Sequence, residues 1–508
     1  MFIDRIAAVA LSCTAALPAP AQPPVSPAQN LPPLATAPTA RSFVSTGSGT
    51  FGTTQLTWRS EVEEIFVSGT GSTPGASIFT TSYVRTGKGA SATRPVIFAF
   101  NGGPGASAIW LHLGFFGPRR IDMDDPANPQ TTPPFRTIPN PDSPLDVADL
   151  VLIDPPGTGW STVLPSGKPE HFCGVEQDAQ AIVQVIREWL RRHGRLNAPK
   201  YLAGESYGTV RAAVVAKLLA GGPTETGEMT GITLNGVMML GQIIDYSARG
   251  EGGDRGFVSI LPTLAATACH FGKAAKDCTS EGQADAARRF IRARYVGALH
   301  AGSSLPDAER QSVAAELSSL TGLPVDSIIA NDLRISGYYY ARTLLAQNRK
   351  RLGMYDARYT LPLGGDGGDP VADDPAMGQY VPSFIGAWSD YARDILKVQI
   401  DQSYQPISFR TINGRWDWGY GPGVPGGRNY GIDLAAAMTR NSKLRLMVAT
   451  GWYDLVTPAG GAEYDIAHSG VPLAQTQFKY YQSGHMPYLG AEPRAVLARD
   501  IRAFVTAR

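Results

Sequence analysis

The sequence predicts an α/β fold with a mostly parallel central sheet, helices on both faces and a mainly helical insertion. Three observations support this prediction. Several continuous apolar runs end in glycine-rich loops, which is typical of strands covered on both faces. A segment with helical spacing stands between two such runs, as in proteins with parallel sheets. Between about residues 245 and 433 helical patterns replace this alternation, which then resumes.

The first strands are expected before residue 105. Residues 55–69 and 76–87 alternate apolar and polar side chains in the manner of half-buried strands. RPVIFAFNGGPG, residues 94–105, is a continuous apolar run that ends in glycines. ADLVLIDPPGTGWS, residues 148–161, has the same pattern. We therefore expect two buried strands, each with a loop at its carboxyl end.

A helix, a strand and a second helix are expected next. The first helix places seven apolar residues on one face, with Gly194 as a plausible stop. These residues are Val175, Ala179, Ile182, Val183, Ile186, Trp189 and Leu190. KYLAGES, residues 200–206, is expected as a strand that ends at a serine, and residues 207–222 as the helix after it.

Residues 282–302 and 308–322 are expected as helices of the insertion, and residues 363–379 and 419–429 as loops. The segments that follow are expected as strand and loop (443–458), strand and loop (476–488) and a closing helix (492–505). No internal repeat is evident.

The whole chain divides into five expected segments. They are a signal peptide (1–21), a disordered linker rich in proline and alanine (22–45), the first part of the core (46–245), the insertion (246–432) and the second part of the core (433–508). The signal peptide implies an exported protein, periplasmic or extracellular.

The overall charge excludes some classes of partner. With 45 basic and 44 acidic residues, the net charge of +1 gives no reason to expect nucleic acid or a membrane surface. No apolar run reaches the roughly 20 residues that span a bilayer, so no stable membrane insertion is expected. The histidines and cysteines lack zinc spacing, so we expect no metal and no cofactor. No pattern specifies the oligomeric state.

Of the four cysteines, Cys13 lies in the expected signal peptide, and the other three leave two alternatives. In an oxidising compartment Cys269 and Cys278 can close a short loop and leave Cys173 buried and free. Three unpaired structural thiols are the other interpretation.

GESYG, residues 204–208, is the best candidate for a catalytic motif. A serine at a sharp turn between strand and helix can act as a nucleophile, provided that a base and an orienting acid lie close. Two later residues suit these roles, because each follows a strand: Asp454 as the acid and His485 as the base. The order Ser206, Asp454, His485 is that of an α/β-hydrolase fold. Asp465 is the weaker acid, expected as a surface charge on a helix, and His468 is the weaker base.

Two backbone amides are expected to stabilise an oxyanion. One belongs to Tyr207, at the start of the helix after the serine. The other belongs to Gly103 in NGGPG, where a tight turn is the alternative interpretation.

Four groups of motifs together resemble the serine carboxypeptidase family (peptidase family S10) of the α/β-hydrolase superfamily, in its bacterial type. They are NGGPGASA with the later GP, DPPGTGWS, GESYGT, and GWYDLVTP with SGHMP. The resemblance implies the triad Ser206, Asp454 and His485 and the oxyanion donors Gly103 and Tyr207. It also implies that Asn101 and Glu205 hold the terminal carboxylate of a peptide, with Glu205 protonated.

The chain departs from the family in one part of this carboxylate site. Phe115 and Phe116 stand where many members have a second glutamate, so the resemblance implies an incomplete pair of acids. Arg119 or Arg120 is a candidate for a compensating charge, although solvated loop residues are the simpler interpretation.

Three functions follow, in this order of preference. The first is a serine-type carboxypeptidase that hydrolyses the C-terminal bond of peptides through an acyl-enzyme. The second is an esterase or acyltransferase on the same scaffold. The third is a hydrolase-like binding protein without turnover. The side-chain preference is not specified; Trp452, Tyr207 and residues 336–342 are candidates for shaping the pocket.

Overall fold

The computed structural model describes residues 39–507, except 70–72, 126–128, 228, 230, 247–252, 366 and 420–427. The expected signal peptide and the linker up to residue 38 therefore lie outside the described residues, as does most of the expected loop 419–429. Residues 42–45, expected in the linker, belong to strand β1 (Ser42–Phe51). β1 pairs antiparallel with β2 (Thr54–Ser68), and this pairing supplies backbone hydrogen bonds to β1. Pairing therefore makes β1 a strand, although its side chains are mostly small and polar.

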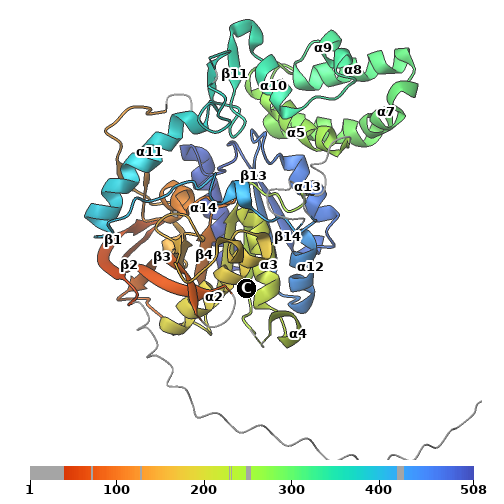
Figure 1. Ribbon diagram of the computed structural model, residues 1–508. Coiled ribbons are helices and arrows are strands. Elements are labelled where there is room, and N and C mark those ends of the chain that lie inside the picture. Colours follow the sequence, from red (N-terminus) through yellow and green to blue (C-terminus); the bar gives the residue numbers. More distant parts are fainter. Residues whose placement is uncertain are drawn as a thin grey trace, which may run out of the picture. The chain divides into compact units, whose positions relative to one another are not determined.

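The central sheet runs through the molecule in the order β1-β2-β3-β7-β4-β9-β10-β13-β14, with β8 beside β3 (Figure 1). From β7 to β14 neighbouring strands are parallel, and from β1 to β7 they are antiparallel. The mostly parallel sheet expected from the sequence is confirmed. The remaining strands are β3 (Pro74–Thr86), β4 (Val96–Phe100), β7 (Asp149–Ile153), β8 (Thr162–Val163), β9 (Lys200–Glu205), β10 (Gly236–Leu240), β13 (Arg445–Gly451) and β14 (Thr476–Tyr481).

The continuous apolar runs are explained by cores on both faces of the sheet. In β4, Ile97 and Ala99 belong to one buried cluster, whereas Phe98 and Phe100 belong to the other. Since successive side chains of a strand point to opposite faces, a strand between two cores must be apolar throughout.

Helices cover both faces, as expected. The core that contains Phe98 is completed by α2 (Val175–Arg192), α3 (Gly208–Leu219) and α12 (Gly431–Arg440). The core that contains Ile97 is completed by α1 (Ile109–Leu111), the π-helix that continues it (His112–Phe116), α11 (Met377–Asp390) and α14 (Ala491–Thr506).

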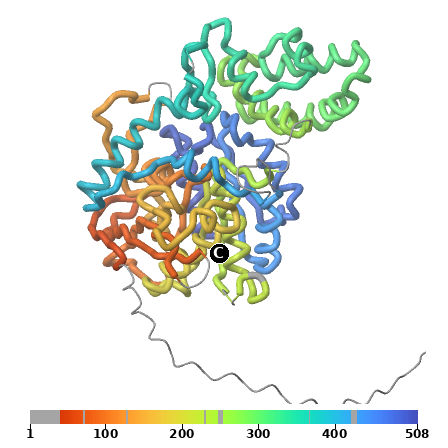
Figure 2. Tube along the Cα trace, viewed as in Figure 1, coloured from red at the N-terminus to blue at the C-terminus, as the bar shows by residue number. Residues whose placement is uncertain are grey.

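The expected insertion, residues 246–432, supplies two different parts. Helices α5 to α10 lie together in one part of the molecule (Figure 1, Figure 2). They surround a third core, which also includes Trp452 and Tyr453 from the loop after β13. Helix α11 packs instead on the sheet. The elements before α11 are α5 (Arg255–His270), α6 (Ser280–Phe290), α7 (Val296–Ala301), α8 (Asp307–Thr321), α9 (Val325–Ala330), α10 (Gly337–Thr343) and the hairpin β11 (Lys350–Leu352) and β12 (Thr360–Pro362).

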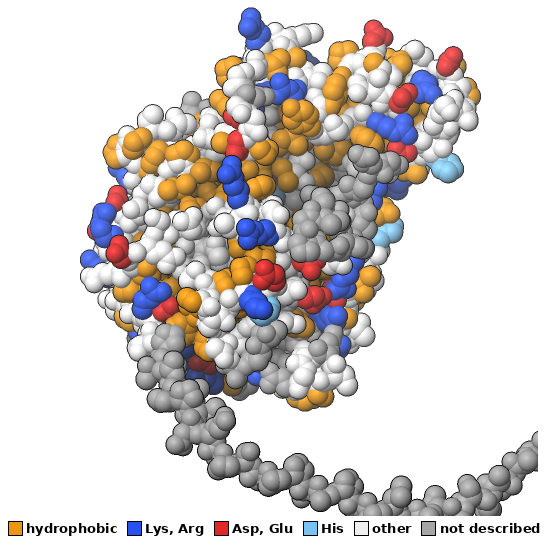
Figure 3. All heavy atoms as spheres, in the orientation of Figure 1, with side chains coloured by type: hydrophobic (Ala, Val, Ile, Leu, Met, Phe, Trp, Pro, Cys, Tyr) orange, Lys and Arg blue, Asp and Glu red, His pale blue; other side chains and the backbone are white. Residues whose placement is uncertain are grey.

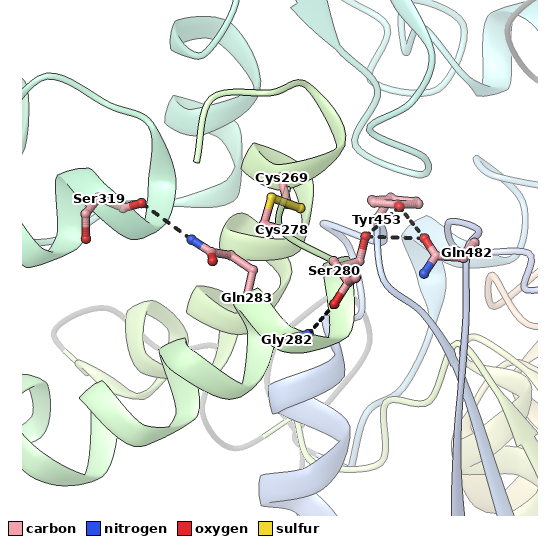
Figure 4. Close-up of a disulfide and its surroundings, with 9 residues drawn as sticks. Cys269, Cys278, Ser280, Gly282, Gln283, Ser319, Tyr453 and Gln482 are labelled. Atoms are coloured by element: carbon pink, nitrogen blue, oxygen red, sulfur yellow. Dashed lines mark hydrogen bonds between the residues drawn. A yellow bond between two sulfur atoms is a disulfide. The ribbon is translucent and has the colours of Figure 1, made fainter. Parts of the chain in front are cut away.

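The cysteines adopt the paired arrangement. Cys269 and Cys278 form a disulfide between the end of α5 and the start of α6 (Figure 4), and Cys173 is free and buried.

The outer surface gives two further observations. Acidic and basic side chains are interspersed over the face seen in Figure 3. In the described part of the chain, none of the helices has both the length and the apolar character needed to cross a bilayer.

Candidate active site

Ser206 lies at the sharp turn between β9 and α3. Its backbone is left-handed, with φ of 59°, a strained conformation for a residue with a side chain. Its amide donates to the carbonyl of Leu240 in the neighbouring strand β10, at 2.9 Å. Gly204 permits this turn, because a Cβ there would lie 2.1 Å from the carbonyl oxygen of Gly208. The turn therefore presents the Ser206 hydroxyl at the carboxyl end of the sheet.

His485 and Asp454 meet at the same edge of the sheet. Asp454 follows β13, His485 follows β14, and the distance from His485 Nδ1 to Asp454 Oδ2 is 2.9 Å. Both side chains are buried. His485 and Ser206 line one cavity, so the imidazole, the carboxyl group and the hydroxyl belong to one site.

Asp454 is held by more than the histidine. Its Oδ1 accepts the amides of Val456 at 2.8 Å and Thr457 at 2.9 Å. Its Oδ2 also accepts the hydroxyl of Thr457, which lies 3.0 Å from His485 Nδ1. Thr457 thus fixes the acid and touches the base. No pattern in the sequence singled out Thr457, although an aspartate at a turn commonly accepts the amides of the residues that follow it.

The two expected oxyanion donors lie on loops that touch. A Cβ on Gly102 would lie 2.4 Å from the amide nitrogen of Tyr207, so only glycine allows this approach. Within the described residues, the amides of Gly103 and Tyr207 donate no hydrogen bond to another protein group. Gly103 lines the cavity beside Ser206. Two amides near a candidate nucleophile are thus available to an oxygen of a ligand.

Asn101 and Glu205 form a buried pair in the wall of the cavity. Asn101 Nδ2 donates to Glu205 Oε1 at 2.6 Å, while Asn101 Oδ1 accepts the amide of Leu111 at 3.1 Å. Burial raises the pKa of Glu205 to about 7; the Asp454 carboxyl also raises it, whereas His485 and the hydrogen bond from Asn101 oppose the shift. Below about pH 7 the neutral form of Glu205 can donate a hydrogen bond.

Tyr488 lies behind Glu205. Among the described residues, Oε2 of Glu205 and the hydroxyl of Tyr488 have no hydrogen-bond partner of good geometry, although both are buried. Each group affects the pKa of the other, so the two lie near one another. Phe115 stacks on the Tyr488 ring with centroids 6.1 Å apart. Phe115 and Phe116 are both fully buried. The segment in which the resemblance implied a missing second acid is thus packed with apolar side chains.

The cavity that Ser206 lines has both polar and apolar side chains. Its polar side chains are Asn101, Glu205, Ser206, Asn413 and His485. Its apolar and aromatic walls are formed by Trp110, Tyr355, Met377, Ile407, Phe409 and Met486, with small residues between them. A ligand with one polar end and an apolar body fits such a lining.

Several candidates from the sequence lie elsewhere. Tyr207 is fully buried against Trp416, with ring centroids 5.2 Å apart, so its side chain does not line the cavity. Trp452 stacks on Tyr480, and residues 336–342 belong to the insertion core or its surface. The aromatic groups that line the cavity are therefore not the ones expected.

The two arginines after the first motif do not reach the carboxylate site. Arg119 donates to Thr137, and Arg120 donates to Ile121 and Asp124. Neither lines the Ser206 cavity. The suggested compensating charge is thus not found, and both arginines secure the loop that follows the π-helix.

Asp465 and His468 are also not among the residues that line the Ser206 cavity. Asp465, expected on the surface, is 4% exposed, because Arg255 of α5 covers it and forms an ion pair with it. Its Oδ2 also accepts the amides of Ile244 and Asp245. His468 stacks on Tyr464 at the end of helix α13 (Ala459–Ala467), with centroids 3.8 Å apart.

Asp154 of DPPGTGWS joins two motif loops. Its Oδ1 accepts the amide of Ala108 at 2.8 Å and the hydroxyl of Tyr404 at 3.0 Å. Burial raises its pKa to about 7, and these two hydrogen bonds oppose the shift. Asp154 thus holds the chain just after NGGPG in place.

One cluster outside the cavity has metal-ligand spacing. Glu61, Glu63 and His193 bring ligand atoms within 4.8 Å of one another. Arg59 forms an ion pair with Glu61, and Arg192 forms one with Glu63. The negative charge of the cluster is therefore already balanced by the protein.

Comparison with known proteins agrees with this geometry. The family model described as serine carboxypeptidase matches residues 79–252, which contain Asn101, Gly103 and Ser206. Carboxypeptidase sxa2 of Schizosaccharomyces pombe is 29% identical over 153 residues, which are 29% of this chain and 26% of that protein. The matched part of the chain spans about a quarter of this relative. The resemblance predicted from the motifs is confirmed.

The fold has a similar solved structure. Kex1ΔP, a prohormone-processing carboxypeptidase from Saccharomyces cerevisiae, superimposes with a TM-score of 0.55 at 15% sequence identity. The match covers 88% of this chain and 91% of that one. The α/β-hydrolase fold expected from the sequence is confirmed.

Proposed function

We propose that this chain, whose residues 79–252 match the serine carboxypeptidase family, is a serine-type carboxypeptidase that removes residues from the carboxyl ends of peptides. One observation carries the proposal. The Ser206 cavity combines a nucleophile and base with the Asn101–Glu205 pair, which suits a terminal carboxylate. The chemistry and the recognition of a chain end thus belong to one site.

The proposed reaction begins with attack of Ser206 Oγ on the last peptide carbonyl. His485 takes the hydroxyl proton and passes it to the amine of the leaving residue, so that an acyl-enzyme forms as the peptide bond breaks. Asp454 holds the imidazole by its Nδ1. The amides of Gly103 and Tyr207 stabilise the oxyanion. Water then attacks the acyl-enzyme, with His485 again as base, and releases the shortened peptide.

Recognition of the chain end is assigned to Asn101 and Glu205. With its pKa raised to about 7, Glu205 is neutral in mildly acidic solution and donates to the substrate carboxylate rather than repelling it. Asn101 is fixed by Leu111 and adds an amide donor. The apolar walls of the cavity support a preference for apolar side chains next to the scissile bond.

A pair of peptides tests this function. The purified protein is incubated with one peptide in two forms, a free terminal carboxylate and a terminal amide, and the products are identified by mass spectrometry. Stepwise loss of single residues from the free form alone is expected, because only that form engages Asn101 and Glu205. Equal cleavage of both forms, or cleavage inside the chain, would refute the proposal. Ser206→Ala serves as the inactive control.

The esterase or acyltransferase alternative is not favoured, since the family match and the curated relative are both carboxypeptidases. Export is the remaining part of the proposal. It is supported by the signal-peptide pattern of residues 1–21 and by the Cys269–Cys278 disulfide, because such bonds persist in oxidising compartments. Amino-terminal sequencing of the protein recovered outside the cytoplasm should begin near Gln22; recovery only from the cytoplasm with Met1 retained would contradict it.

A further inference from the structure

The loop between β11 and β12, residues 353–359, reaches from the insertion to the two loops that carry Asp454 and His485. The carbonyl of Met354 accepts the amide of Leu455 at 3.0 Å, and the amide of Ala357 donates to the carbonyl of Tyr453 at 3.0 Å. These contacts lie on both sides of Asp454. The hairpin loop of the insertion is therefore paired with the loop of the candidate acid.

The same hairpin loop holds the histidine itself. The amide of His485 donates to the carbonyl of Tyr355 at 2.6 Å, and the two rings pack edge to face with centroids 5.3 Å apart. Gly484 allows this approach, because a Cβ there would lie 2.4 Å from the Tyr355 carbonyl oxygen. Contacts from the insertion thus hold both the backbone and the ring of His485.

Arg358 binds the histidine loop at both of its ends. Its guanidinium donates to the carbonyl of Gln482 at 2.6 Å and to the carbonyl of Leu489 at 3.2 Å. Between these points it donates to the hydroxyl of Ser483 at 3.2 Å. An arginine presents several donors in a fixed plane, so one side chain can fasten three groups that a lysine cannot reach together.

Arg358 is itself held by a buried partner. Asp356 accepts both Nε and Nη2 of Arg358, and the two side chains are 2% and 10% exposed, respectively. The guanidinium also lies over the ring of Tyr453, 5.6 Å from its centroid. The hydroxyl of Tyr453 is 2.8 Å from Ser280 of α6 and bonds to Gln482 (Figure 4). Acid loop, histidine loop and insertion therefore meet at Arg358.

We infer that Arg358 is a positioning residue for His485: from the hairpin of the insertion it fixes residues 482–489, so that the imidazole stays aligned between Asp454 and Ser206. Arg358 is not among the residues that line the Ser206 cavity, so the inferred role is positioning and not contact with the substrate. This inference rests on the proposed role of His485 as the base. The inference gives the insertion a role in positioning the base, in addition to its role in lining the cavity.

The test compares Arg358→Gln with the matched control Arg94→Gln. Arg94 is also buried, pairs with one carboxylate (Asp149) and donates to the carbonyls of Leu145 and Asp146. Asp149 begins β7, so this ion pair lies at the opposite end of the strands from Ser206. Both variants lose a buried ion pair, and only Arg358→Gln frees the histidine loop.

Three readouts are measured on the full protein. The first is hydrogen exchange of peptides that cover residues 482–489, the second is the rate at which a fluorophosphonate labels Ser206, and the third is kcat and KM for an unblocked peptide. Arg358→Gln should speed exchange in 482–489 and lower labelling and kcat by about 10- to 100-fold, the usual cost of misplacing a catalytic group by about 1 Å. KM should stay near the wild-type value, because Asn101 and Glu205 are untouched. Arg94→Gln should keep wild-type exchange in 482–489 and wild-type labelling, whatever its thermal stability.

Wild-type exchange and labelling in Arg358→Gln would overturn the inference, as would equal losses in Arg94→Gln. If Arg358→Gln does not fold, Arg358→Lys keeps a cation beside Asp356 but cannot fasten all three groups; its labelling rate should be below that of the wild type, and an unchanged rate would again overturn the inference. Absence of labelling in the wild type would contradict the proposed function, while the exchange measurement would still decide the role of Arg358.

Discussion

The Nδ1 atom of His485 lies 2.9 Å from Oδ2 of Asp454, and neither side chain is open to solvent. Asp454 is fastened in turn by two amides and by Thr457. A histidine held in this way by Nδ1 keeps Nε2 for the proton of a nucleophile. The role proposed for Asp454 therefore depends on the charge of its side chain and not only on its shape, and this can be measured.

Asp454→Asn should lower kcat by about four orders of magnitude with little change in KM, because an amide cannot hold the imidazole in the required tautomer. Steady-state kinetics on an unblocked peptide measure this. Asp465→Asn is the matched control, since Asp465 is also a buried acid near the insertion but pairs with Arg255. It should reduce thermal stability and leave turnover near the wild-type value. Equal loss in both variants would contradict the assignment of Asp454.

Substrate binding should depend on the ionisation of Glu205. Its raised pKa of about 7 keeps the side chain neutral at lower pH, and ionisation above that value introduces repulsion with the substrate carboxylate. KM for an unblocked peptide should therefore rise as the pH passes through about 7. In Glu205→Gln the side chain stays neutral, so the rise should disappear.

An ester substrate without a free carboxylate provides the control for this profile. The KM of the ester should not depend on the ionisation of Glu205, so Glu205→Gln should leave its pH profile unchanged. The reason is that the ester has no negative charge where the peptide has its terminal carboxylate. The same transition with both kinds of substrate would assign it to a group other than the Glu205 carboxylate site.

Asp154 should make the folded protein less stable at higher pH. Its pKa rises from 3.8 to about 7 on burial, so the folded protein binds more protons than the unfolded chain between these pH values. The free energy of unfolding must then fall as the pH rises through this window, by at most about 4 kcal/mol at 1.4 kcal/mol per pKa unit. Asp154→Asn removes this ionisation. It should reduce the change in the free energy of unfolding over this pH range by about 1–4 kcal/mol.

Urea unfolding at pH 4.5 and pH 7.5 measures this difference. Asp390→Asn, at an acid whose side chain is 63% exposed, should leave the pH dependence as it is. An unchanged slope in Asp154→Asn would show that the carboxyl is already ionised at pH 4.5 in the folded protein.

The disulfide should stabilise the insertion without taking part in the chemistry. Cys269 and Cys278 are nine residues apart. Closing a loop of about ten residues contributes about 2–3 kcal/mol in the chain-entropy account. The double variant Cys269→Ser and Cys278→Ser should therefore melt at a lower temperature and still be labelled at Ser206. Dithiothreitol should lower the melting temperature of the wild type alone; an equal effect on the double variant would contradict this origin.

The parts of the fold that the sequence predicted are those with strong local patterns. Strand β4 and the middle of β9 are apolar because cores cover both faces of the sheet, and such runs are visible in the sequence itself. Ser206 and Asp454 could be proposed because each follows a buried strand, and His485 because it follows a strand near the carboxyl terminus. Strand β1 was missed, since its serines, threonines and glycines resemble a linker until pairing with β2 is known.

The parts that could not be predicted depend on contacts distant in the sequence. Arg358 binds residues that are at least 124 positions away in the sequence. Nothing in the residues around Arg358 indicates these contacts. Asp465 has the helical setting of a surface acid and becomes buried only because Arg255 of the insertion covers it. The aromatic groups of the cavity, such as Tyr355 and Phe409, come from loops without a regular spacing.

The most direct test of the proposed mechanism is the site and rate of covalent labelling by a fluorophosphonate, measured by intact mass and peptide mapping in the wild type and in His485→Ala. We expect one adduct per chain, on Ser206, and a loss of nearly all labelling when the imidazole is removed. An adduct on another residue, or a Ser206 adduct that forms as fast in His485→Ala as in the wild type, would contradict it.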